Sequence, residues 1–528
     1  MSLLDDVSIV VTPNGYKAGE LYAVVPTPVL GAELVDCSSF DCADPAAIWS
    51  EGSGWSFSEG KAIYDGTGGT SGLSQSNVIE VGKQYKITVE VLSNQGSGSN
   101  TIYLGGTVLS SSHLSVGTHV FYGVTSNTNV NVYIYGRSGE VFEVGSLSVK
   151  EYTSADMDVT RATAATRVDE DGLIEDVLSN VPRIDYTGGG CPHILSEPER
   201  TNLVTYSEAL TSTTNVTSSN TTSPDGTLSG LKLNETTSNS QHYGTSYEAS
   251  VVDDGTIYTI SFYIKKGTYD LVKVYTQSSR IAASIYITFS TESTTASGSD
   301  FVSDSDFMED AGNGWYRVGF SATANSTGSV SIYLSPKDLT TYVGDVSQYT
   351  EYWGAQIEAG SYATSYIPTS GSTVTRNQDV FTRDGIGSLI NDSEGVLFAE
   401  IAALSDDLTY REISLSDGTS TNRIEIRYTT NSNRIQVLIR NGSYLALQYD
   451  VSSIVDFNKV AFKWKTGDFA LWVNGVERAT DATAFATSGL NRLAFDQSPS
   501  GNEFYGKVKQ LQVYNTALTD TQLAALTS

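Results

Sequence analysis

Cysteine and histidine are scarce in this chain of 528 residues, which contains three cysteines and four histidines. Three cysteines are too few for a disulfide framework, although Cys37 and Cys42 are close enough in sequence to bridge in an oxidising medium. We expect both of these thiols to be reduced. The histidines are scattered along the chain, whereas a zinc-type site needs clustered ligands. The scarcity therefore argues against a disulfide-stapled fold and against a metal centre of this kind.

Basic residues are also few: 31 lysines and arginines stand against 60 aspartates and glutamates, a net charge of −29. Nucleic-acid phosphates and anionic membrane surfaces both attract a basic protein surface, so we expect neither as a partner. The charge balance is compatible with neutral glycans or with a cationic protein partner.

Long apolar runs are missing, since no stretch approaches the 18 apolar residues of a membrane-spanning helix. The first residues, MSLLDDVSIVV, carry acids where a secretory signal carries bases. We therefore expect a protein that is made in a cytoplasm, is not exported by that route and does not insert into a membrane.

Helical periodicity is rare as well, and only the C-terminal TDTQLAALTS predicts a short helix, with Thr519 or Asp520 as its cap. Charged residues make up 17% of the chain, and 31 tyrosines stand against 3 methionines. This composition is typical of many short strands joined by polar turns. The sequence thus predicts an all-β protein of tandem antiparallel sandwiches. Its length predicts three or four domains, because one core cannot serve so many residues.

Residues 31–152 have the pattern of an antiparallel β-sandwich. In GKQYKITVEVLSN the residues Tyr85, Ile87, Val89 and Val91 alternate with polar residues, as they do in a half-buried strand. Further short strands follow at the spacing expected of a sandwich.

Residues 204–369 repeat this plan. The segment GTIYTISFYIKKG matches GKQYKITVEVLSN, and GWYRVGFSATANSTGSVSIYLSP matches GTHVFYGVTSNTNVNVYIYGR. Two copies of one sandwich favour a binding or scaffold role over a single active site. A linker, residues 370–392, precedes a third set of strands in residues 393–528, where NKVAFKWKTGDFALWVNG predicts a hairpin.

Residues 1–30 contain two apolar runs around Pro13-Asn14-Gly15, a pattern that predicts a β-hairpin. A lone hairpin is marginally stable in water, so this one must pack on something. Two interpretations are open: a docking arm received by another protein, or an edge hairpin of the first domain.

Residues 153–203 predict a structured connector between two β-domains, with a loop at Gly188-Gly189-Gly190. The connector contains TRATAATRV, NVPRIDYTGGGCP and SEPERTNL. In this order the three motifs resemble a connector of structural proteins of tailed bacteriophages, chiefly tail and fibre proteins. A second resemblance to phage virion proteins lies at the end of the second sandwich, in YWGAQIEAG followed by SYATSYIPTSGSTVTR.

The sandwiches resemble known modules too. Residues 31–152 have an opening GW strand, a GK-x-Y-K strand and a closing SLSVKE strand. This order is similar to a carbohydrate-binding module of jelly-roll type, of which residues 204–369 are the second copy. Residues 393–528 resemble a concanavalin A-like (laminin G-like) sandwich, whose last long strand and C-terminal helix often read much like FYGKVKQLQVYNTALT.

No motif predicts an enzyme. Glycanases of the laminarinase type, which share the concanavalin A-like fold, carry an E-x-D-x-x-E strand. The nearest string, Arg423-Ile424-Glu425-Ile426-Arg427, lacks the second and third acids. Nucleophile-elbow, zincin, P-loop and Rossmann patterns are absent from the sequence. We expect no catalytic residues.

No cofactor is expected, although the acidic run of residues 299–314 leaves room for a structural calcium ion. The run is not an EF-hand: counted from Asp304, the sixth position is Glu309 where glycine is needed, and the twelfth is Trp315 where glutamate is needed. Any calcium would therefore bind in a sandwich loop.

Glycan sites in such modules stack sugar rings on exposed aromatic side chains, because Tyr and Trp combine an apolar face with a polar edge. Most tyrosines here are simply good sheet formers. The candidate glycan-binding residues are Trp55, Tyr133, Tyr135 and Arg137 in the first sandwich, with Trp472 and Asn474 in the last.

The resemblances together imply a non-enzymatic virion structural protein of a tailed phage, a tail or fibre component. Its N-terminal part would dock to other virion proteins, and its sandwiches would bind a glycan on the host surface. Copies of the chain are expected to form a homo-oligomer, a trimer. The alternatives are a depolymerase that cleaves surface polysaccharide, and a scaffold that binds only virion neighbours.

Overall fold

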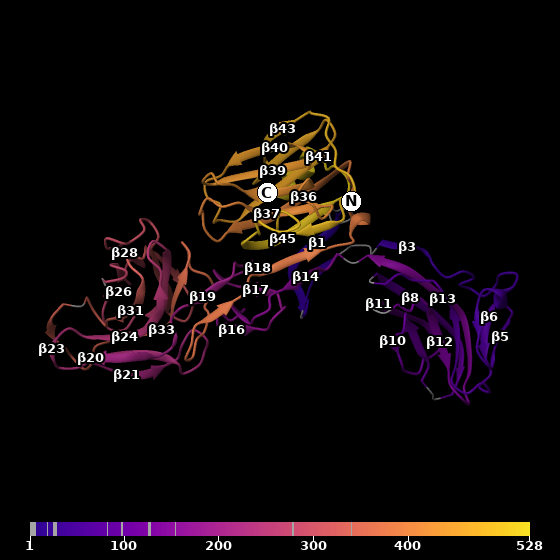
Figure 1. Ribbon diagram of the computed structural model, residues 1–528, viewed down its shortest axis with the longest axis horizontal. Coiled ribbons are helices and arrows are strands. Elements are labelled where there is room, and N and C mark those ends of the chain that lie inside the picture. The colour runs from indigo at the N-terminus through magenta and orange to yellow at the C-terminus, as the bar shows by residue number, and fades with distance from the viewer. Residues whose placement is uncertain are drawn as a thin grey trace. The chain divides into compact units, whose positions relative to one another are not determined.

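Alternating apolar and polar residues form antiparallel strands along most of the chain in the computed structural model (Figure 1). The structure describes residues 7–17, 19–24, 29–81, 83–96, 99–124, 128–153, 155–276, 279–338 and 340–528. Within these ranges the one α-helix is α1 (Asp520–Thr527), which begins with a capping box between Thr519 and Gln522. None of the helices described is long and apolar enough to cross a membrane. The predicted all-β fold and the predicted C-terminal helix are confirmed.

The chain divides into two compact units. One unit is Val25–Ala155, which holds the first predicted sandwich. The other unit combines Met1–Val24 with Asp156–Ser528, so the connector, the second sandwich, the linker and the C-terminal sandwich lie together with the N-terminal hairpin.

The first sandwich packs two sheets face to face. Its elements are β3 (Val29–Glu33), η2 (Pro45–Ala47), β4 (Ser50–Glu51), β5 (Trp55–Ser58), β6 (Lys61–Tyr64), β7 (Ser71–Gln75), β8 (Gln84–Gln95), β9 (Thr101–Leu104), β10 (Thr107–Ser110), β11 (Gly117–Val124), β12 (Val132–Gly136) and β13 (Val141–Thr153). One sheet has the order β10-β9-β12-β7-β4, and the other has β11-β8-β13-β6-β5, with β3 beside β13. The predicted inward residues of β8, from Tyr85 to Val91, are all buried in the core between the sheets.

The second sandwich is built in the same way. Its strands are β20 (Leu210–Thr214), β21 (Val216–Thr221), β22 (Gly230–Glu235), β23 (Asn239–Ser240), β24 (Tyr243–Val252), β25 (Ile257–Lys265), β26 (Leu271–Thr276), β27 (Ser284–Thr288), β28 (Ser293–Ser297), β29 (Phe307–Asp310), β30 (Trp315–Thr323), β31 (Gly328–Leu334), β32 (Tyr342–Val343) and β33 (Tyr349–Ala359). One sheet has the order β20-β24-β31-β26-β27-β28, and the other has β21-β22-β33-β25-β30-β29.

The strand orders of the two sandwiches correspond. The order β10-β9-β12-β7-β4 maps onto β27-β26-β31-β24-β20, and β11-β8-β13-β6-β5 maps onto β30-β25-β33-β22-β21. The matched sequence segments occupy matching places, because GKQYKITVEVLSN supplies β8 and GTIYTISFYIKKG supplies β25. The predicted repeat is therefore present in the fold.

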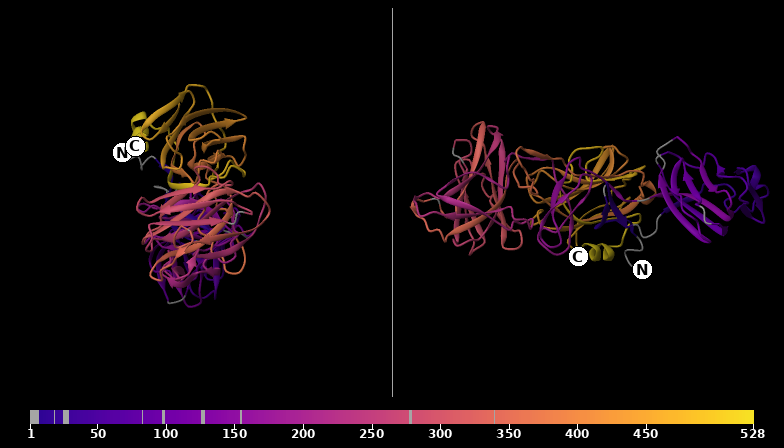
Figure 2. Two further views of the ribbon diagram at one scale, coloured as in Figure 1. Left: turned by 90° about the vertical axis from the view of Figure 1, so that its left-hand side faces the viewer. Right: turned by 90° about the horizontal axis from the view of Figure 1, so that it is seen from below.

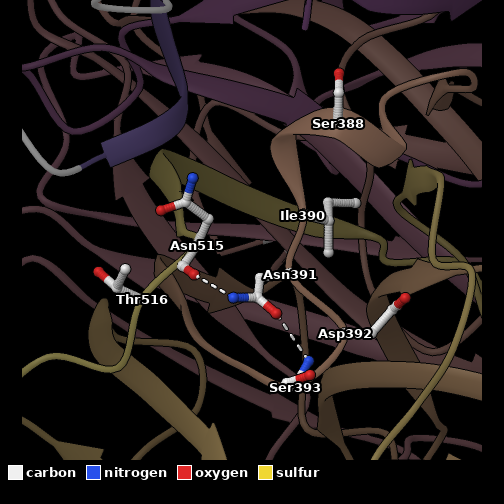
Figure 3. Close-up of a pocket in the computed structure, with 7 residues that line it drawn as sticks. All are labelled: Ser388, Ile390, Asn391, Asp392, Ser393, Asn515 and Thr516. Atoms are coloured by element: carbon white, nitrogen blue, oxygen red, sulfur yellow. Dashed lines mark hydrogen bonds between the residues drawn. The ribbon is translucent and has the colours of Figure 1, made fainter.

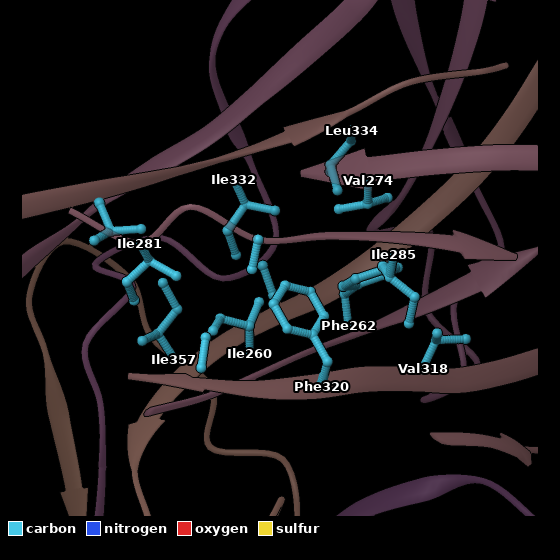
Figure 4. Close-up of a cluster of buried hydrophobic side chains, with 14 of the residues drawn as sticks. Ile260, Phe262, Val274, Ile281, Ile285, Val318, Phe320, Ile332, Leu334 and Ile357 are labelled. Atoms are coloured by element: carbon cyan, nitrogen blue, oxygen red, sulfur yellow. The ribbon is translucent and has the colours of Figure 1, made fainter. Parts of the chain in front are cut away.

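Branched and aromatic side chains from both sheets fill the core of the second sandwich (Figure 4). Ile260 and Phe262 of β25 and Phe320 of β30 meet Ile332 of β31 and Ile285 of β27. Full burial of one such side chain contributes about 1.5–3 kcal/mol. Trp353 of β33 packs in a neighbouring buried cluster with Tyr263, Trp315 and Tyr366.

The C-terminal sandwich follows the predicted strand pattern, including the hairpin of β41 and β42. Its elements are η3 (Gly387–Leu389), β36 (Glu394–Ala403), β37 (Arg411–Ser416), β38 (Asn422–Tyr428), β39 (Arg434–Asn441), β40 (Ser443–Asp450), β41 (Asn458–Lys465), β42 (Phe469–Val473), β43 (Val476–Asp481), β44 (Arg492–Ala494) and β45 (Gly506–Tyr514). The strands run β40-β39-β38-β37-β44 in one layer and β45-β36-β41-β42-β43 in the other. Helix α1 packs on the outside of the second layer, against β41 and β42. It is the yellow helix beside the C-terminus in Figure 2.

The N-terminal hairpin belongs to this C-terminal sandwich, which corrects both interpretations of residues 1–30. Strand β1 (Val7–Lys17) pairs with β2 (Glu20–Val24) as predicted, and its other edge pairs with β45, with Ile9 opposite Val513 (Figure 1). The chain's own sheet therefore receives the apolar face, and neither another protein nor the first domain is needed for its burial. Residues 1–6, 18 and 25–28 of the predicted hairpin lie outside the described residues.

The connector and the linker contribute short strands to the same unit. These strands are β14 (Met157–Thr160), β15 (Ala165–Val168), β16 (Ile174–Val177), β17 (Arg183–Asp185), β18 (His193–Ser196), β19 (Arg200–Asn202), β34 (Val374–Arg376) and β35 (Val380–Arg383). Strand β14 bridges β2 and β35, and β18 pairs with β45, so both segments extend the sheet of the C-terminal sandwich. Gly188, Gly189 and Gly190 all have positive φ, which accounts for the predicted loop.

Five charged side chains from these segments form a buried ion-pair cluster, the connector network: Arg161, Arg183, Glu197, Arg376 and Asp379. All five are almost completely shielded from solvent. Arg161 reaches Asp379 at 2.8 Å and Arg376 reaches Glu197 at 2.7 Å, while Arg183 pairs with both acids. Burial opposes ionisation of Glu197, but Arg183 and Arg376 outweigh it and hold the pKa of this carboxyl well below its usual range.

The expectation of reduced thiols at Cys37 and Cys42 is wrong, because the structure joins them in a disulfide. Cys37 adopts a left-handed backbone with φ of 56°, and the resulting turn brings the two Cα atoms to 5.7 Å. Cys191 is a free, exposed thiol.

The connector network predicts a large stability cost for Asp379→Ala. The substitution leaves the buried Arg161 without its counter-charge and Arg183 with Glu197 alone, and breaking a buried pair in this way costs about 3–5 kcal/mol. Chemical unfolding of the whole chain measures the loss. The matched control is Asp450→Ala, which breaks the exposed ion pair with Arg434 and should leave the unfolding midpoint unchanged. Equal midpoints for the two variants would contradict a stabilising network.

The packing of the N-terminal hairpin in the sheet of the C-terminal sandwich predicts that Leu21→Ala destabilises the larger unit. Leu21 is fully buried on β2, and truncation of a buried leucine costs about 2–5 kcal/mol. The control Leu178→Ala removes the same atoms from a side chain that is 72% exposed and should have little effect. Thermal unfolding compares the two variants. A Leu21→Ala protein as stable as the control would show that the hairpin is dispensable to this unit.

Candidate functional site

The outer face of the sheet β10-β9-β12-β7-β4 gathers aromatic side chains. On β12, Val132 and Ile134 point into the core, and the alternation directs Tyr133 and Tyr135 to the opposite face. Arg137 follows two residues after Tyr135 and therefore lies on the same side. The structure thus brings together three of the six predicted glycan-binding residues.

Tyr103 of the neighbouring strand β9 completes this face and was missed from the sequence. It lies directly opposite Tyr133 in the register, and its ring meets that of Tyr135 edge-on at 5.3 Å between centroids. The rings of Tyr133 and Tyr135 are 6.0 Å apart. We call Tyr103, Tyr133, Tyr135 and Arg137 the first tyrosine face. A short strand of four residues such as β9 has too little alternation to reveal its outward side, so only strand pairing identifies Tyr103.

A glycine fixes the position of the Tyr135 ring. Gly72 of β7 is the cross-strand partner of Tyr135, and a Cβ atom at Gly72 would lie 3.0 Å from the Tyr135 ring. A side chain at position 72 would therefore require the Tyr135 ring to shift by a few tenths of an ångström. The arrangement spreads the aromatic surface across β9, β12 and β7.

Polar groups at the edge of this face are oriented by hydrogen bonds. Arg137 donates from Nε to the carbonyl of Ser99 and from Nη2 to the hydroxyl of Thr101, each at 3.1 Å. Asn131 donates to the Tyr133 hydroxyl at 2.7 Å. Burial and the neighbouring phenols raise the pKa of Tyr135, so its hydroxyl stays protonated at neutral pH. The face therefore offers aromatic rings, hydroxyl donors and one guanidinium.

Trp55 is not part of the first tyrosine face, which corrects its candidacy. Only 6% of its surface is exposed, and its ring packs on Tyr64 and Phe142 in the core. Its indole N–H donates to the carbonyl of Ser71. A ring enclosed in this way cannot stack on a sugar.

Trp472 and Asn474 have structural roles as well, so their candidacy is also corrected. Trp472 is 7% exposed and packs beneath helix α1 with Phe398 and Leu523. Asn474 adopts φ of 50° in the turn between β42 and β43, where its side chain binds the backbone of Lys459. The two residues do not form a shared site.

The acidic run of residues 299–314 gathers no metal ligands in the structure. Asp300 accepts from the backbone of Ala282 and from Asn325, and Asp306 accepts from Thr294. Among the described residues no group of three or more His, Cys, Asp or Glu side chains is placed to hold a metal ion.

The strand that carries Glu425 holds a second charged cluster. Arg423, Glu425 and Arg427 of β38 share one face with Glu412 of β37, and both carboxylates are fully buried. Arg427 lies 2.8 Å from Glu425 and 3.3 Å from Glu412, and Arg423 pairs with Glu425. Asn502 donates to Glu412 at 3.1 Å. Burial, followed by repulsion from Glu425, raises the pKa of Glu412 to about 8.

A shallow hollow lies beside η3, where the loop before β36 meets the end of β45 (Figure 3). Asn391 donates to the carbonyl of Asn515 and accepts from the backbone of Ser393. The Asp392 carboxylate accepts from two backbone N–H groups. Because loop contacts already engage these polar groups, the hollow offers no convergent set of ligands.

The C-terminal sandwich matches a known protein family. Residues 403–524 match the model of the concanavalin A-like lectin/glucanases superfamily. The C-terminal sandwich is a concanavalin A-like domain. The match covers the strands from β37 to β45 and most of α1, and it does not include the N-terminal strands β1 and β2.

Solved structures show weaker likenesses. The CBM40 of the Ruminococcus gnavus IT-sialidase, bound to alpha2,3 sialyllactose, is 21% identical over 26% of this chain and 84% of that chain, with a TM-score of 0.24. Domain 4 of an extracellular arabinanase from Geobacillus stearothermophilus, in complex with arabinotriose, is 15% identical over 29% of this chain and 73% of that chain, also at 0.24. These scores carry no conclusion about function. No curated protein matches the sequence.

The buried Glu412 predicts that the stability of the concanavalin A-like domain falls as the pH rises from about 5 to about 9. A carboxyl whose pKa is higher in the folded than in the unfolded chain holds its proton better when folded, so folding is penalised once the pH passes the unfolded pKa. A tenfold difference in proton affinity between the two states corresponds to about 1.4 kcal/mol, so the loss amounts to a few kcal/mol. Thermal unfolding across this pH range measures it.

The control for this effect is Glu412→Gln, which keeps the shape of the side chain and removes its titration. This variant should lose most of the slope between pH 5 and pH 9, and Glu400→Gln, at a partly buried carboxylate on β36, should keep it. An unchanged slope in Glu412→Gln would assign the pH dependence to another group.

Proposed function

We propose that this chain is a non-enzymatic, glycan-binding structural protein of a tailed-phage virion. The first tyrosine face is the observation that carries the glycan-binding part. It combines three tyrosine rings and an arginine on one sheet face, outside the core, and aromatic rings beside polar groups suit the apolar faces and hydroxyls of sugars. The concanavalin A-like domain supports the proposal, since its superfamily includes lectins as well as glucanases.

The virion part of the proposal is supported by the sequence motifs of the connector and of the end of the second sandwich. These motifs resemble phage tail and fibre proteins, and their charged residues form the connector network. We propose that the chain assembles as a trimer with virion neighbours, because several weak glycan sites on one particle gain from avidity. The N-terminal hairpin pairs with β45 in the chain's own sheet, so we assign no separate docking arm to it.

The absence of enzymatic activity is part of the same proposal. The paired carboxylates Glu412 and Glu425 are enclosed and paired to arginines, whereas glycosidic cleavage needs two carboxyl groups on either side of an accessible bond. Incubation of the protein with bacterial capsule or lipopolysaccharide distinguishes the alternatives. Retention of the protein on a polysaccharide that keeps its length supports a binding protein. Shortening of the polysaccharide means a depolymerase, and neither retention nor shortening means a scaffold.

Substitution of the first tyrosine face tests the assignment directly. Tyr133→Ala with Tyr135→Ala should weaken retention on the bound polysaccharide by about tenfold or more, equivalent to about 1.4 kcal/mol. The control is Tyr122→Ala, which removes a half-exposed tyrosine from β11 on the other sheet of the same sandwich. Affinity electrophoresis measures retention, and thermal unfolding verifies that the variants fold. Equal loss in the control, or no loss in the double variant, would remove the binding role from this face.

A further inference from the structure

The second sandwich carries an aromatic face on the strands that correspond to those of the first tyrosine face. In the matched strand orders, β31 corresponds to β12 and β26 corresponds to β9. The matched segments VSIYLS and VYIYGR align Tyr333 of β31 with Tyr135 of β12. The alternation on β31 places Ile332 and Leu334 in the core, so Tyr333 lies on the outer side of the sheet.

The tyrosines of this face contact one another across three strands. Tyr275 of β26 lies opposite Tyr333 in the register, and their rings stack at 4.4 Å with an interplanar angle of 12°. Tyr243 of β24 meets Tyr333 edge-on at 5.3 Å. Burial, with the neighbouring phenols, raises the pKa of Tyr275 to about 12, so its hydroxyl remains protonated. The result is an aromatic strip that continues across the sheet.

A cation lies at the corresponding end of each face. In the first sandwich Arg137 lies two residues after Tyr135 on β12. In the second, Lys273 lies two residues before Tyr275 on β26, and because β26 runs antiparallel to β31 this is the same end of the face. The ammonium of Lys273 lies 4.9 Å above the ring of Tyr286 on the next strand. The position of the charge is therefore kept although the strand that supplies it differs.

We propose that Tyr243, Tyr275, Tyr333 and Lys273, the second tyrosine face, bind a glycan that carries carboxylate groups, such as a chain of uronic or sialic acids. This inference rests on the proposed glycan-binding function and extends it to a site in the second sandwich. The stacked rings receive the apolar face of a sugar, and the ammonium pairs with its carboxylate.

The charges of the two tyrosine faces favour an acidic sugar over a neutral one. The chain has a net charge of −29, so a random surface position is more often acidic than basic. Both tyrosine faces nevertheless carry a cation, and no carboxylate of the described residues forms an ion pair with either of them. A cation without an acidic partner, next to stacked rings, is suited to an anionic group on the ligand.

The test uses the full chain with the first face disabled by Tyr133→Ala and Tyr135→Ala. The probes are polygalacturonate, alginate, hyaluronan and polysialic acid, each compared with its carboxyl-reduced form by affinity electrophoresis. We expect the disabled chain to retain binding to at least one acidic probe and to bind its carboxyl-reduced form at least tenfold more weakly. Adding Lys273→Ala should remove this preference, and Lys273→Arg should restore it.

The matched control is Lys232→Ala in the same background. Lys232 lies 3.7 Å above the ring of Tyr349 on the other sheet of this sandwich, so its removal changes the net charge equally without touching the second tyrosine face. Tyr275→Ala provides an independent variant, and thermal unfolding of each protein verifies the fold.

The outcomes separate this inference from the proposed function. If the disabled chain binds no glycan while the unmodified chain does, the second face is not a site, and the proposed function stands. Binding that ignores the carboxylates, or equal losses in Lys273→Ala and Lys232→Ala, overturns the ligand class. If the unmodified chain binds no polysaccharide at all, glycan binding itself fails, and this inference fails with it.

Discussion

The burial of five charges in the connector network is the constraint on which the larger unit depends. A buried arginine without a counter-charge is strongly unfavourable. Arg161, Arg183 and Arg376 can therefore be buried only together with the carboxylates of Glu197 and Asp379. Asp379 lies 218 residues after Arg161 in the chain. Ser365, at the end of the second sandwich, donates to Glu197 as well, so the network joins that sandwich to the connector and the linker.

The connector network brings together charged residues from each motif of the connector and from the stretch after the second sandwich. TRATAATRV supplies Arg161, NVPRIDY supplies Arg183, SEPERTNL supplies Glu197, and the stretch after the second sandwich supplies Arg376 and Asp379. Motifs that lie far apart in sequence thus meet at one buried point. Their residues stabilise one another, because the removal of Asp379 leaves the buried Arg161 without its ion-pair partner and the removal of Glu197 does the same to Arg376.

The two tyrosine faces follow from the repeat of one sandwich plan. Packing dictates the inward residues of both copies, which alternate with outward residues that the core does not restrict. One tyrosine occupies the corresponding outward position in each copy, Tyr135 in the first and Tyr333 in the second, and a cation lies at the same end of both faces. The concanavalin A-like domain is built differently, since its sheet takes strands from the beginning of the chain and its polar face encloses Glu412 and Glu425.

Local sequence pattern determined the strands, the all-β class, the repeat, the capped helix and the grouping of Tyr133, Tyr135 and Arg137, because a period of two places alternate residues on one side. The pattern could not show which side of a strand is covered by other parts of the fold. Trp55 and Trp472 also lie in strands, yet sheet packing and helix α1 enclose them, while Tyr103 became recognisable only through its neighbour on β12. Tertiary structure alone decided the pairing of β1 with β45, the Cys37–Cys42 disulfide and the connector network. The strand pairing and the network depend on contacts between residues far apart in the chain, which leave no local trace in the sequence, and the disulfide depends on a turn that the spacing of the two cysteines permits but does not dictate.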